Sequence, residues 1–262
     1  MQCIQHLREW RDLRRALAPD LSIGFVPTMG NLHAGHASLY EKSRSDNDLT
    51  FASLFINPTQ FNRVDDLIHY PRTLDDDLSL LADIGVDYCL LPHEKDMYPD
   101  DYHYQIHENH QSLLMEGIHR SGHFTGMLTV VMKLLQLIKP HRAYFGEKDH
   151  QQLHLIRGMV EAFFIDTDII SCPTIREPSG LAKSSRNHRL TIDQRQVADQ
   201  FARIFHQKTR STQQLKDELK QLKLEVQYLQ DFEGRRYVAV NIGEIRLIDN
   251  YAIQDQACSQ DS

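Results

Sequence analysis

The amino-acid sequence predicts an α/β fold, in which a doubly wound parallel sheet is followed by a small C-terminal α+β domain. Three observations predict it: apolar runs alternate with helix-period segments up to about residue 175, polar segments follow those runs, and composition changes after about Asn187. A chain of 262 residues is long enough for one large domain or two modest ones. We expect one domain over residues 1–175 and a second over residues 176–262.

The first domain contains the predicted parallel sheet. Five apolar runs are predicted as buried strands: Ser22 to Val26, Leu49 to Ile56, Val86 to Leu91, Ala143 to Phe145 and Thr167 to Ser171. Four segments between and after them are predicted as helices: Gly35 to Arg44, Thr73 to Ile84, Phe124 to Ile138 and His150 to Phe164. Such alternation indicates a parallel sheet with crossover helices, which binds ligands at the carboxyl ends of its strands.

The C-terminal part of the chain predicts helices followed by hairpins. Thr191 caps a helix that runs to Phe205, and a second, charged helix covers Thr212 to Leu222. Apolar and polar residues then alternate, as in half-exposed strands of sequential hairpins, over Leu224 to Leu229, Arg236 to Asn241 and Glu244 to Ile248. The tail from Asp255 to Ser262 is expected to fray.

Charge and composition exclude several classes of function. Lys and Arg number 29 against 36 Asp and Glu, and the net charge of −7 argues against non-specific nucleic-acid binding. The apolar stretch Met127 to Ile138 is too short to span a bilayer, and Arg8 and Glu9 interrupt any signal peptide. The four cysteines are scattered, as is usual in a reducing compartment. We therefore expect a cytoplasmic protein with no membrane or nucleic-acid partner.

Two histidines lie where the first predicted strand leads into a helix, in the sequence PTMGNLHAGH at residues 27–36. Backbone amides and the helix dipole favour an anion at such a place. His33 and His36 are three residues apart, so their imidazoles share one face and can donate to phosphate oxygens. A zinc pair or two ordinary surface histidines are the alternatives, and the glycine-rich turn favours phosphate.

Polar residues also end two other predicted strands. Asn57 and Gln60 follow the second strand, where they can present amide groups to a small polar ligand, although most strands end in turn residues. After the fourth strand, the turn GEKD at residues 146–149 places Lys148 as a cation for phosphate, with Gln152 one helical turn later.

Two further segments allow both a structural and a functional interpretation. Thr73 is predicted to cap a helix whose dipole the following acids complement, and a carboxylate from that run can also help to hold Mg²⁺ beside phosphates. The stretch from Ile175 to Asn187 concentrates Lys, Arg, Ser and Gly, either as a basic linker between domains or as a loop that closes over a polyphosphate. The density of donors favours the loop.

An HxGH turn early in the chain and a Ser/Lys/Arg loop late in it are the layout of the nucleotidyltransferase superfamily. Within that superfamily the sequence closely resembles the pantothenate synthetases (pantoate–β-alanine ligases). The matching stretches are PTMGNLHAGH at 27–36, FINPTQF at 55–61, YPRTLDDDL at 70–78, GHFTGMLTVVMKLL at 122–135, FGEKDHQQL at 145–153 and GLAKSSRN at 180–187, with RLIDN at 246–250 resembling the C-terminal strand of the family. These stretches are collinear and cover nearly the whole chain.

The resemblance implies a Rossmann-like domain that binds ATP and pantoate, followed by a phosphate-contacting loop and a small lid-like domain, usually in a homodimer. It also implies a ligation in two steps with Mg²⁺. ATP and (R)-pantoate give pantoyl-adenylate and pyrophosphate, and β-alanine then attacks the adenylate to give pantothenate and AMP.

The resemblance assigns site residues by position. Those implied as catalytic are His36, His33, Lys148 and Arg186. Those implied for ATP are Met29, Gly30, Asn31, Leu32, His33, Ala34, Gly35, His36, Gly146, Glu147, Lys148, Asp149, Ile175, Lys183, Ser184, Ser185 and Arg186. Gln60 and Gln152 are implied for pantoate, and Asp76 and Asp77 are the candidates for Mg²⁺.

The loop departs from the common family pattern at Ser179, where the family has Asp, and at Lys183, where it has Met. Three alternatives to the ligase remain. One is another adenylyl or cytidylyl transferase with the same HxGH turn, and the second is a metallohydrolase that uses His33, His36 and an Asp. The third is a nucleotide sensor without catalytic activity.

Overall fold

A computed structural model describes residues 1–253 of the chain, and the tail predicted to fray lies outside the described residues. The chain divides into two compact units, one from Met1 to Pro173 and one from Thr174 onward. Each unit has its own sheet and its own hydrophobic core.

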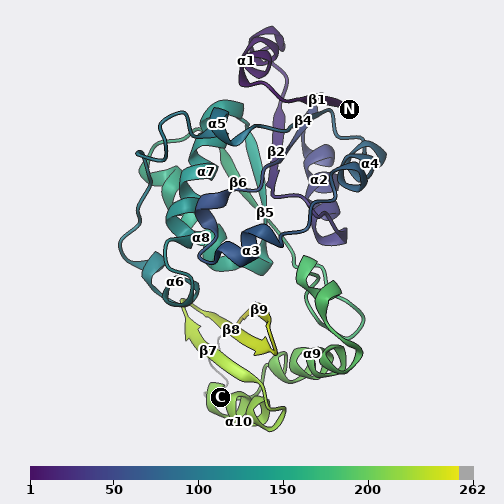
Figure 1. Ribbon diagram of the computed structural model, residues 1–262, viewed down its shortest axis with the longest axis vertical. Coiled ribbons are helices and arrows are strands. Elements are labelled where there is room, and N and C mark those ends of the chain that lie inside the picture. Colours follow the sequence, from purple (N-terminus) through teal and green to yellow (C-terminus); the bar gives the residue numbers. More distant parts are fainter. Residues whose placement is uncertain (254–262) are drawn as a thin grey trace, which may run out of the picture. The chain divides into compact units, whose positions relative to one another are not determined.

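The first unit is built on a parallel sheet of six strands, in agreement with the predicted fold class (Figure 1). The strands are β1 (Gln2–Ile4), β2 (Ile23–Thr28), β3 (Leu49–Leu54), β4 (Tyr88–Leu90), β5 (Arg142–Gly146) and β6 (Asp168–Cys172). Their order across the sheet is β1-β4-β3-β2-β5-β6, and every pair is parallel. β2 pairs with β3 on one side and with β5 on the other, so the direction of winding reverses between β2 and β5.

Helices cover both faces of this sheet (Figure 1). One face packs against α1 (Leu7–Ala16), α7 (His123–Ile138) and α8 (His150–Ala162), and the other packs against α2 (Ala34–Asp46) and α4 (Leu74–Ile84). The shorter elements of this unit are η1 (Pro58–Gln60), α3 (Val64–Ile68), α5 (Glu94–Met97), η2 (Gln111–Leu113), α6 (Glu116–His119) and η3 (Glu147–Asp149).

The second unit is a three-stranded antiparallel sheet packed against two helices. It contains η4 (Ser185–Arg189), α9 (Ile192–Phe205), α10 (Thr212–Gln221), β7 (Glu225–Phe232), β8 (Arg235–Ile242) and β9 (Ile245–Ala252), with β8 in the middle of the sheet. Thr191 caps α9 as predicted, because its hydroxyl accepts the backbone N–H of Gln194. The sequential hairpins predicted from the alternating pattern are also present.

The structure contains elements that were not predicted from the sequence, including the short helices α3, α5 and α6, and one predicted helix cap makes no hydrogen bond. Strand β1 and helix α1 were not predicted: β1 has only three residues, and the apolar stripe Leu7, Trp10 and Leu13 of α1 was not recognised in the sequence. Thr73 occupies the N-cap position of α4 without donating or accepting a capping hydrogen bond, and its hydroxyl is buried with no partner among the described residues. The three acids of the first turn of α4 therefore complement the helix dipole without a side-chain cap.

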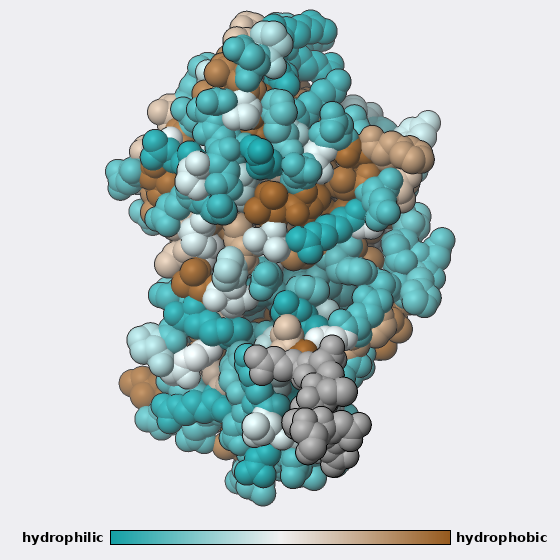
Figure 2. Space-filling model, turned by 180° about the vertical axis from the view of Figure 1, so that it is seen from behind, coloured by the Kyte–Doolittle hydropathy of each residue, from teal (hydrophilic) through white to brown (hydrophobic). Residues whose placement is uncertain are grey.

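The face shown in Figure 2 is largely hydrophilic, with hydrophobic side chains in small separate groups. Large apolar side chains that are more than half exposed are scattered along the chain: Val64, Ile68, Tyr104, Leu113, Ile118, Phe163, Phe164 and Ile192. Within residues 1–253, no helix has the length and the apolar character needed to cross a membrane.

Candidate active site

The carboxyl ends of β2 and β5 lie next to each other at the reversal point of the sheet. The chain leaves β2 at Thr28 and enters α2 at Ala34, and it leaves β5 at Gly146 and passes through η3 into α8. Two of the predicted ATP segments, residues 29–36 and 146–149, therefore start from neighbouring strand ends. A reversal point of this kind is where open α/β sheets bind their ligands.

His33 and His36 form the beginning of α2. His33 is the N-cap residue, and its Nδ1 accepts the backbone N–H of Gly35 at 3.0 Å, while His36 Nδ1 accepts the backbone N–H of His33 at 3.3 Å. The two rings lie 4.1 Å apart between centroids. Because each Nδ1 accepts, each neutral ring carries its proton on Nε2. The turn thus holds two imidazole N–H donors at a helix N-terminus, as the phosphate hypothesis requires.

The charges around His36 come from both turns. The pKa of His36 is lowered to about 3, chiefly by burial and next by the charge of His33. Asp149 opposes this shift, and Lys148 adds to it. His36 is consequently neutral at physiological pH. Lys148 Nζ lies 3.6 Å from the carboxylate of Asp149. The charges of Lys148 and Asp149 thus act on His36, which places the Lys148 turn near the two histidines.

Asp77 holds the turn that precedes the histidines. Its side chain is buried, and its two oxygens accept the backbone N–H groups of Asn31 at 2.8 Å and of Leu32 at 2.7 Å. Gly30 and Asn31 have φ angles of 83° and 53°, in the left-handed region, which costs energy for a non-glycine residue. The carboxylate compensates for this conformation. Asp76, its neighbour, is exposed.

Replacing Asp77 by Asn is expected to loosen this turn. An amide can accept only one of the two backbone N–H groups and presents its own N–H₂ group to the other, so about 1–3 kcal/mol of stability is lost. We expect a lower midpoint in thermal unfolding, in line with a lost hydrogen bond to a charged group. The control is Asp75→Asn, which removes the same charge from an exposed side chain in the first turn of α4. A wild-type unfolding midpoint for Asp77→Asn would contradict the assignment.

Gln60 is held in place by the first turn of α7. His123 Nδ1 donates to the carbonyl oxygen of Gln60 at 2.8 Å, and Asn57 Nδ2 donates both to Gln60 Oε1 at 3.0 Å and to the carbonyl of Gly126 at 3.1 Å. Gln60 Nε2 lies 3.0 Å from the sulfur of Met29, in the HxGH turn. Since Oε1 accepts from Asn57, the amide group is oriented with its N–H₂ end towards that turn.

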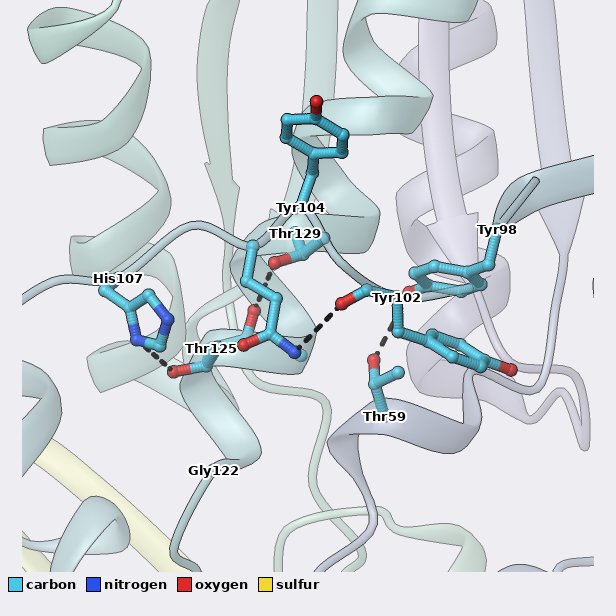
Figure 3. A pocket seen from close by; sticks show the side chains of 10 residues that line it. Thr59, Tyr98, Tyr102, Tyr104, His107, Gly122, Thr125 and Thr129 are labelled. Carbon is cyan, nitrogen blue, oxygen red and sulfur yellow. Dashed lines mark hydrogen bonds between the residues drawn. The ribbon is translucent and has the colours of Figure 1, made fainter. Parts of the chain in front are cut away.

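The same contact between α7 and η1 borders a surface pocket (Figure 3). The pocket has a volume of about 220 Å³ and is lined by Thr59, Tyr98, Tyr102, Tyr104, Gln105, His107, Gly122, Thr125, Gly126 and Thr129. Thr59 and Tyr98 share a hydrogen bond of 3.2 Å across it. None of the residues predicted for ATP or pantoate lines this pocket, so it is distinct from the candidate site.

His123 makes the stability of the fold depend on pH, and a variant at this position can separate its effect from that of other groups. Burial lowers the pKa of this ring to about 4, and the charge of Arg120 acts in the same direction, while the hydrogen bond to Gln60 opposes them. Between pH 6.5 and 4 the unfolded chain binds a proton here that the folded chain does not. The neutral His123 ring therefore makes its full contribution to the free energy of unfolding above pH 6.5. This contribution is lost on acidification, by up to about 1.4 kcal/mol per pH unit.

The variant His123→Asn isolates this effect, since the amide N–H of Asn can replace Nδ1–H without titrating. We expect wild-type protein to lose stability faster than the variant as pH falls from 7 to 5 in denaturant titrations. Parallel losses in the two proteins would show that His123 is protonated equally in folded and unfolded chains.

The remaining predicted residues lie on α8 and in the second unit. Gln152 is half-buried on the first turn of α8. In the second unit, Ile175 accepts the backbone N–H of Lys183 at 2.9 Å through its carbonyl. The residues from Lys183 to Arg186 are half-buried, and Ser184 caps η4 by accepting the N–H of Arg186 at 3.2 Å.

Sequence reasoning missed the residues that support the site. Asp77 appeared there as a metal candidate and as one of the acids that complement a helix dipole, and neither His123 nor Gly126 was given a role. The resemblance had marked GHFTGMLTVVMKLL at residues 122–135, and the His and Gly of that stretch were the available signal.

The family model described as pantoate-beta-alanine ligase matches residues 1–252. The chain belongs to the pantoate–β-alanine ligase family. It is 59% identical over 253 residues to the pantothenate synthetase of Legionella pneumophila, covering 97% of this chain and 100% of that protein. It is 51% identical over 256 residues to the pantothenate synthetase of Coxiella burnetii, covering 97% and 98%.

Solved structures of the same family have the same fold. The pantoate–β-alanine ligase of Francisella tularensis, a complex with beta-gamma ATP and beta-alanine, has a TM-score of 0.92 at 43% identity over 96% of this chain and 97% of that one. The pantothenate synthetase of Thermus thermophilus has a TM-score of 0.87 at 36% identity over 97% and 99%. The chain is therefore an enzyme of the pantoate–β-alanine ligase family, and the resemblance drawn from the sequence is confirmed.

Proposed function

We propose that this enzyme joins (R)-pantoate to β-alanine with ATP, through a pantoyl-adenylate intermediate, and releases pyrophosphate and AMP. A free carboxylate resists attack by an amine because its oxide is a poor leaving group. Transfer of the adenylyl group of ATP to a carboxylate oxygen makes AMP the leaving group, and AMP departs readily. The mixed anhydride also reacts with water, so the site has to exclude water until the amine arrives.

The observation that carries this proposal is the meeting of His33, His36 and Lys148 at the reversal point of the parallel sheet, in a chain of this family. Two imidazole Nε2–H donors and an ammonium group suit the oxygens of a triphosphate. Gln60, held beside the same turn by Asn57, offers an amide N–H₂ to a hydroxy acid. The ATP and β-alanine of the Francisella tularensis complex agree with this choice of substrates.

In the first step the pantoate carboxylate attacks the α-phosphorus of ATP in line with the departing pyrophosphate. The chain contributes position and charge, because a second reactant held in place converts a bimolecular step into a unimolecular one. Gln60 and Gln152 bind pantoate, the turns at residues 29–36 and 146–149 bind the nucleotide, and Lys148 and Arg186 stabilise the charge that develops on the phosphates. No covalent enzyme intermediate is required. In the second step the amine of β-alanine displaces AMP.

The side chains near the site fit a Mg²⁺ ion that arrives bound to the triphosphate and takes few ligands from the protein. Among residues 1–253 no three His, Cys, Asp or Glu side chains cluster closely enough to hold a metal, and Asp77 already accepts two backbone N–H groups. Mg²⁺ commonly keeps several waters and takes its other ligands from phosphates and one or two carboxylates. Asp76 and Asp77 remain its predicted protein contacts, and the ion neutralises phosphate charge when bound.

An isotope-exchange assay tests the proposal directly. With ATP, Mg²⁺ and pantoate but no β-alanine, labelled pyrophosphate is expected to enter ATP, because adenylate formation is reversible. Addition of β-alanine is then expected to give pantothenate and AMP in equal amounts. Exchange that proceeds equally well without pantoate would reject the ligase and indicate another nucleotidyltransferase.

We also propose that the enzyme is a cytoplasmic homodimer. The cysteines at 3, 89 and 172 are free thiols, which fits a reducing compartment. Light scattering on the purified protein is expected to give about twice the chain mass of 30.5 kDa. A mass of one chain at micromolar concentration would reject the dimer.

A further inference from the structure

A buried carboxylate in the second unit lies among four hydrogen-bond donors. Asp249, on β9, has a side chain that is 1% exposed. Its oxygens accept Arg176 Nη1 at 2.7 Å, Arg176 Nη2 at 2.9 Å, His206 Nε2 at 3.0 Å and the backbone N–H of Asn250 at 2.8 Å. A carboxylate offers about four acceptor positions, so this one is fully used.

These donors keep Asp249 ionised inside the unit. Burial acts to raise its pKa, but the hydrogen bonds from His206 and Arg176 outweigh burial and hold the pKa below its usual value. The pair with Arg176 is bidentate, and such a fork fixes geometry as well as energy. Asp249 belongs to the RLIDN stretch that the sequence resemblance marked and to which no role was given.

Arg176 lies at the foot of a short hairpin that leads into the segment Lys183–Arg186. Arg176 pairs with Ala182 in an antiparallel bridge, and Lys183 N donates to the carbonyl of Ile175 at 2.9 Å. Arg176 Nη1 also donates to the carbonyl of Gly180 at 3.0 Å, near the tip of the hairpin. One guanidinium thus connects both arms of the hairpin to Asp249.

The other end of the segment is fixed to the same hairpin. Asn187 Nδ2 donates to Glu177 Oε1 at 3.0 Å and to the carbonyl of Ala182 at 3.0 Å. The helix that contains Asn187, η4, packs against β9. The segment Lys183–Arg186 therefore runs between two points that both depend on the position of the hairpin, and the hairpin depends on Arg176.

We infer that Asp249 is a positioning residue, which holds the segment Lys183–Arg186 in its binding conformation through Arg176. The inference rests on the proposed function in one respect, that this segment contacts the phosphates of ATP. Asp249 itself lies in the core of the unit and contacts no substrate. Its contribution is to fix the hairpin, so that the ammonium and guanidinium of the segment lose little conformational freedom when ATP binds.

The test compares Asp249→Asn with Asp231→Asn. Asp231 forms a bidentate pair with Arg236 in the same unit, at 2.6 Å and 2.9 Å, and also accepts the hydroxyl of Thr212, so these partners lie outside the hairpin. Trypsin is applied to the folded, ligand-free proteins, and cleavage after Lys183 and Arg186 is followed by mass spectrometry. We expect at least a fivefold faster cleavage there for Asp249→Asn and a wild-type rate for Asp231→Asn.

Steady-state kinetics give the second readout. For Asp249→Asn we expect KM for ATP to rise about tenfold, while KM for pantoate and for β-alanine stays within twofold. Faster cleavage with an unchanged KM for ATP would support the positioning role and reject the contact between the segment and ATP. Wild-type cleavage for Asp249→Asn, or equal acceleration in Asp231→Asn, would overturn the inference.

A milder variant covers the case in which Asp249→Asn does not fold. Arg176→Lys keeps the positive charge beside Asp249 but cannot form the fork or reach Gly180 at the same time. It is expected to change cleavage and KM for ATP in the same directions by two- to threefold. No change in either measurement would overturn the inference.

Discussion

Replacement of Gly126 by alanine is expected to lower the free energy of unfolding by about 2–3 kcal/mol and to raise KM for pantoate at least tenfold. A Cβ at this position would lie 2.3 Å from the carbonyl oxygen of Thr59 and 2.7 Å from the backbone nitrogen of Gln60. Backbone atoms cannot rotate away, so η1 has to move. Gln60 moves with it and loses its alignment with Asn57.

Gly158→Ala is the matched control for this variant. Gly158 also lies inside a helix, α8, and a Cβ there meets no atom within 4 Å. Alanine is favoured over glycine in a helix by up to about 1 kcal/mol, so Gly158→Ala is expected to stabilise the protein. Denaturant titration and pantoate kinetics on both variants separate steric conflict from helix propensity. A wild-type denaturation midpoint for Gly126→Ala would contradict close packing between α7 and η1.

The sequence predicted most of the first unit because its elements have strong local signals. β2 and β3 are apolar runs, and α7 is apolar on nearly every side, so their burial could be inferred without neighbours. β1 gave no such signal, since a three-residue edge strand with one buried side chain has no detectable period. Helix α1 was missed although it has a helical signal, because Leu7, Trp10 and Leu13 recur every three residues and face the same core.

Candidate site residues could be predicted where the donors are close together in sequence. They could not be predicted where their role depends on contacts between distant residues. The HxGH and GEKD turns carry their donors within four residues, so their sequence indicates phosphate. The residues that hold the parts of the site in place are far apart in sequence. Asp77 lies 46 residues from Asn31, and His123 lies 63 residues from Gln60. No local pattern distinguishes a carboxylate that holds a backbone turn from one that binds a metal.

His36→Ala is expected to lower kcat/KM for ATP by a factor of about 10² to 10³, the usual effect of removing one positioned hydrogen-bond donor from a site of developing charge. The lowered pKa of His36, about 3, keeps the ring neutral at assay pH, and its Nδ1 accepts the N–H of His33. Its proton is therefore on Nε2, where it can donate to a phosphate oxygen without being transferred. His154→Ala, on the exposed side of α8, is the control and is expected to leave the rate unchanged.

Two further variants separate the donor from the helix cap. The amide nitrogen of Gln can reach the position of Nε2, whereas the amide of Asn reaches only that of Nδ1 and can keep the capping hydrogen bond. We expect His36→Gln to retain about ten times more activity than His36→Asn, in steady-state assays of adenylate formation. Higher activity in His36→Asn would mean that the cap matters more than the donor. A loss of wild-type kcat/KM with an apparent pKa near 6.5, absent in His36→Gln, would instead show that the ring titrates in the free enzyme. The lowered pKa predicts no such loss, because a ring whose pKa is about 3 takes up no proton near pH 6.5.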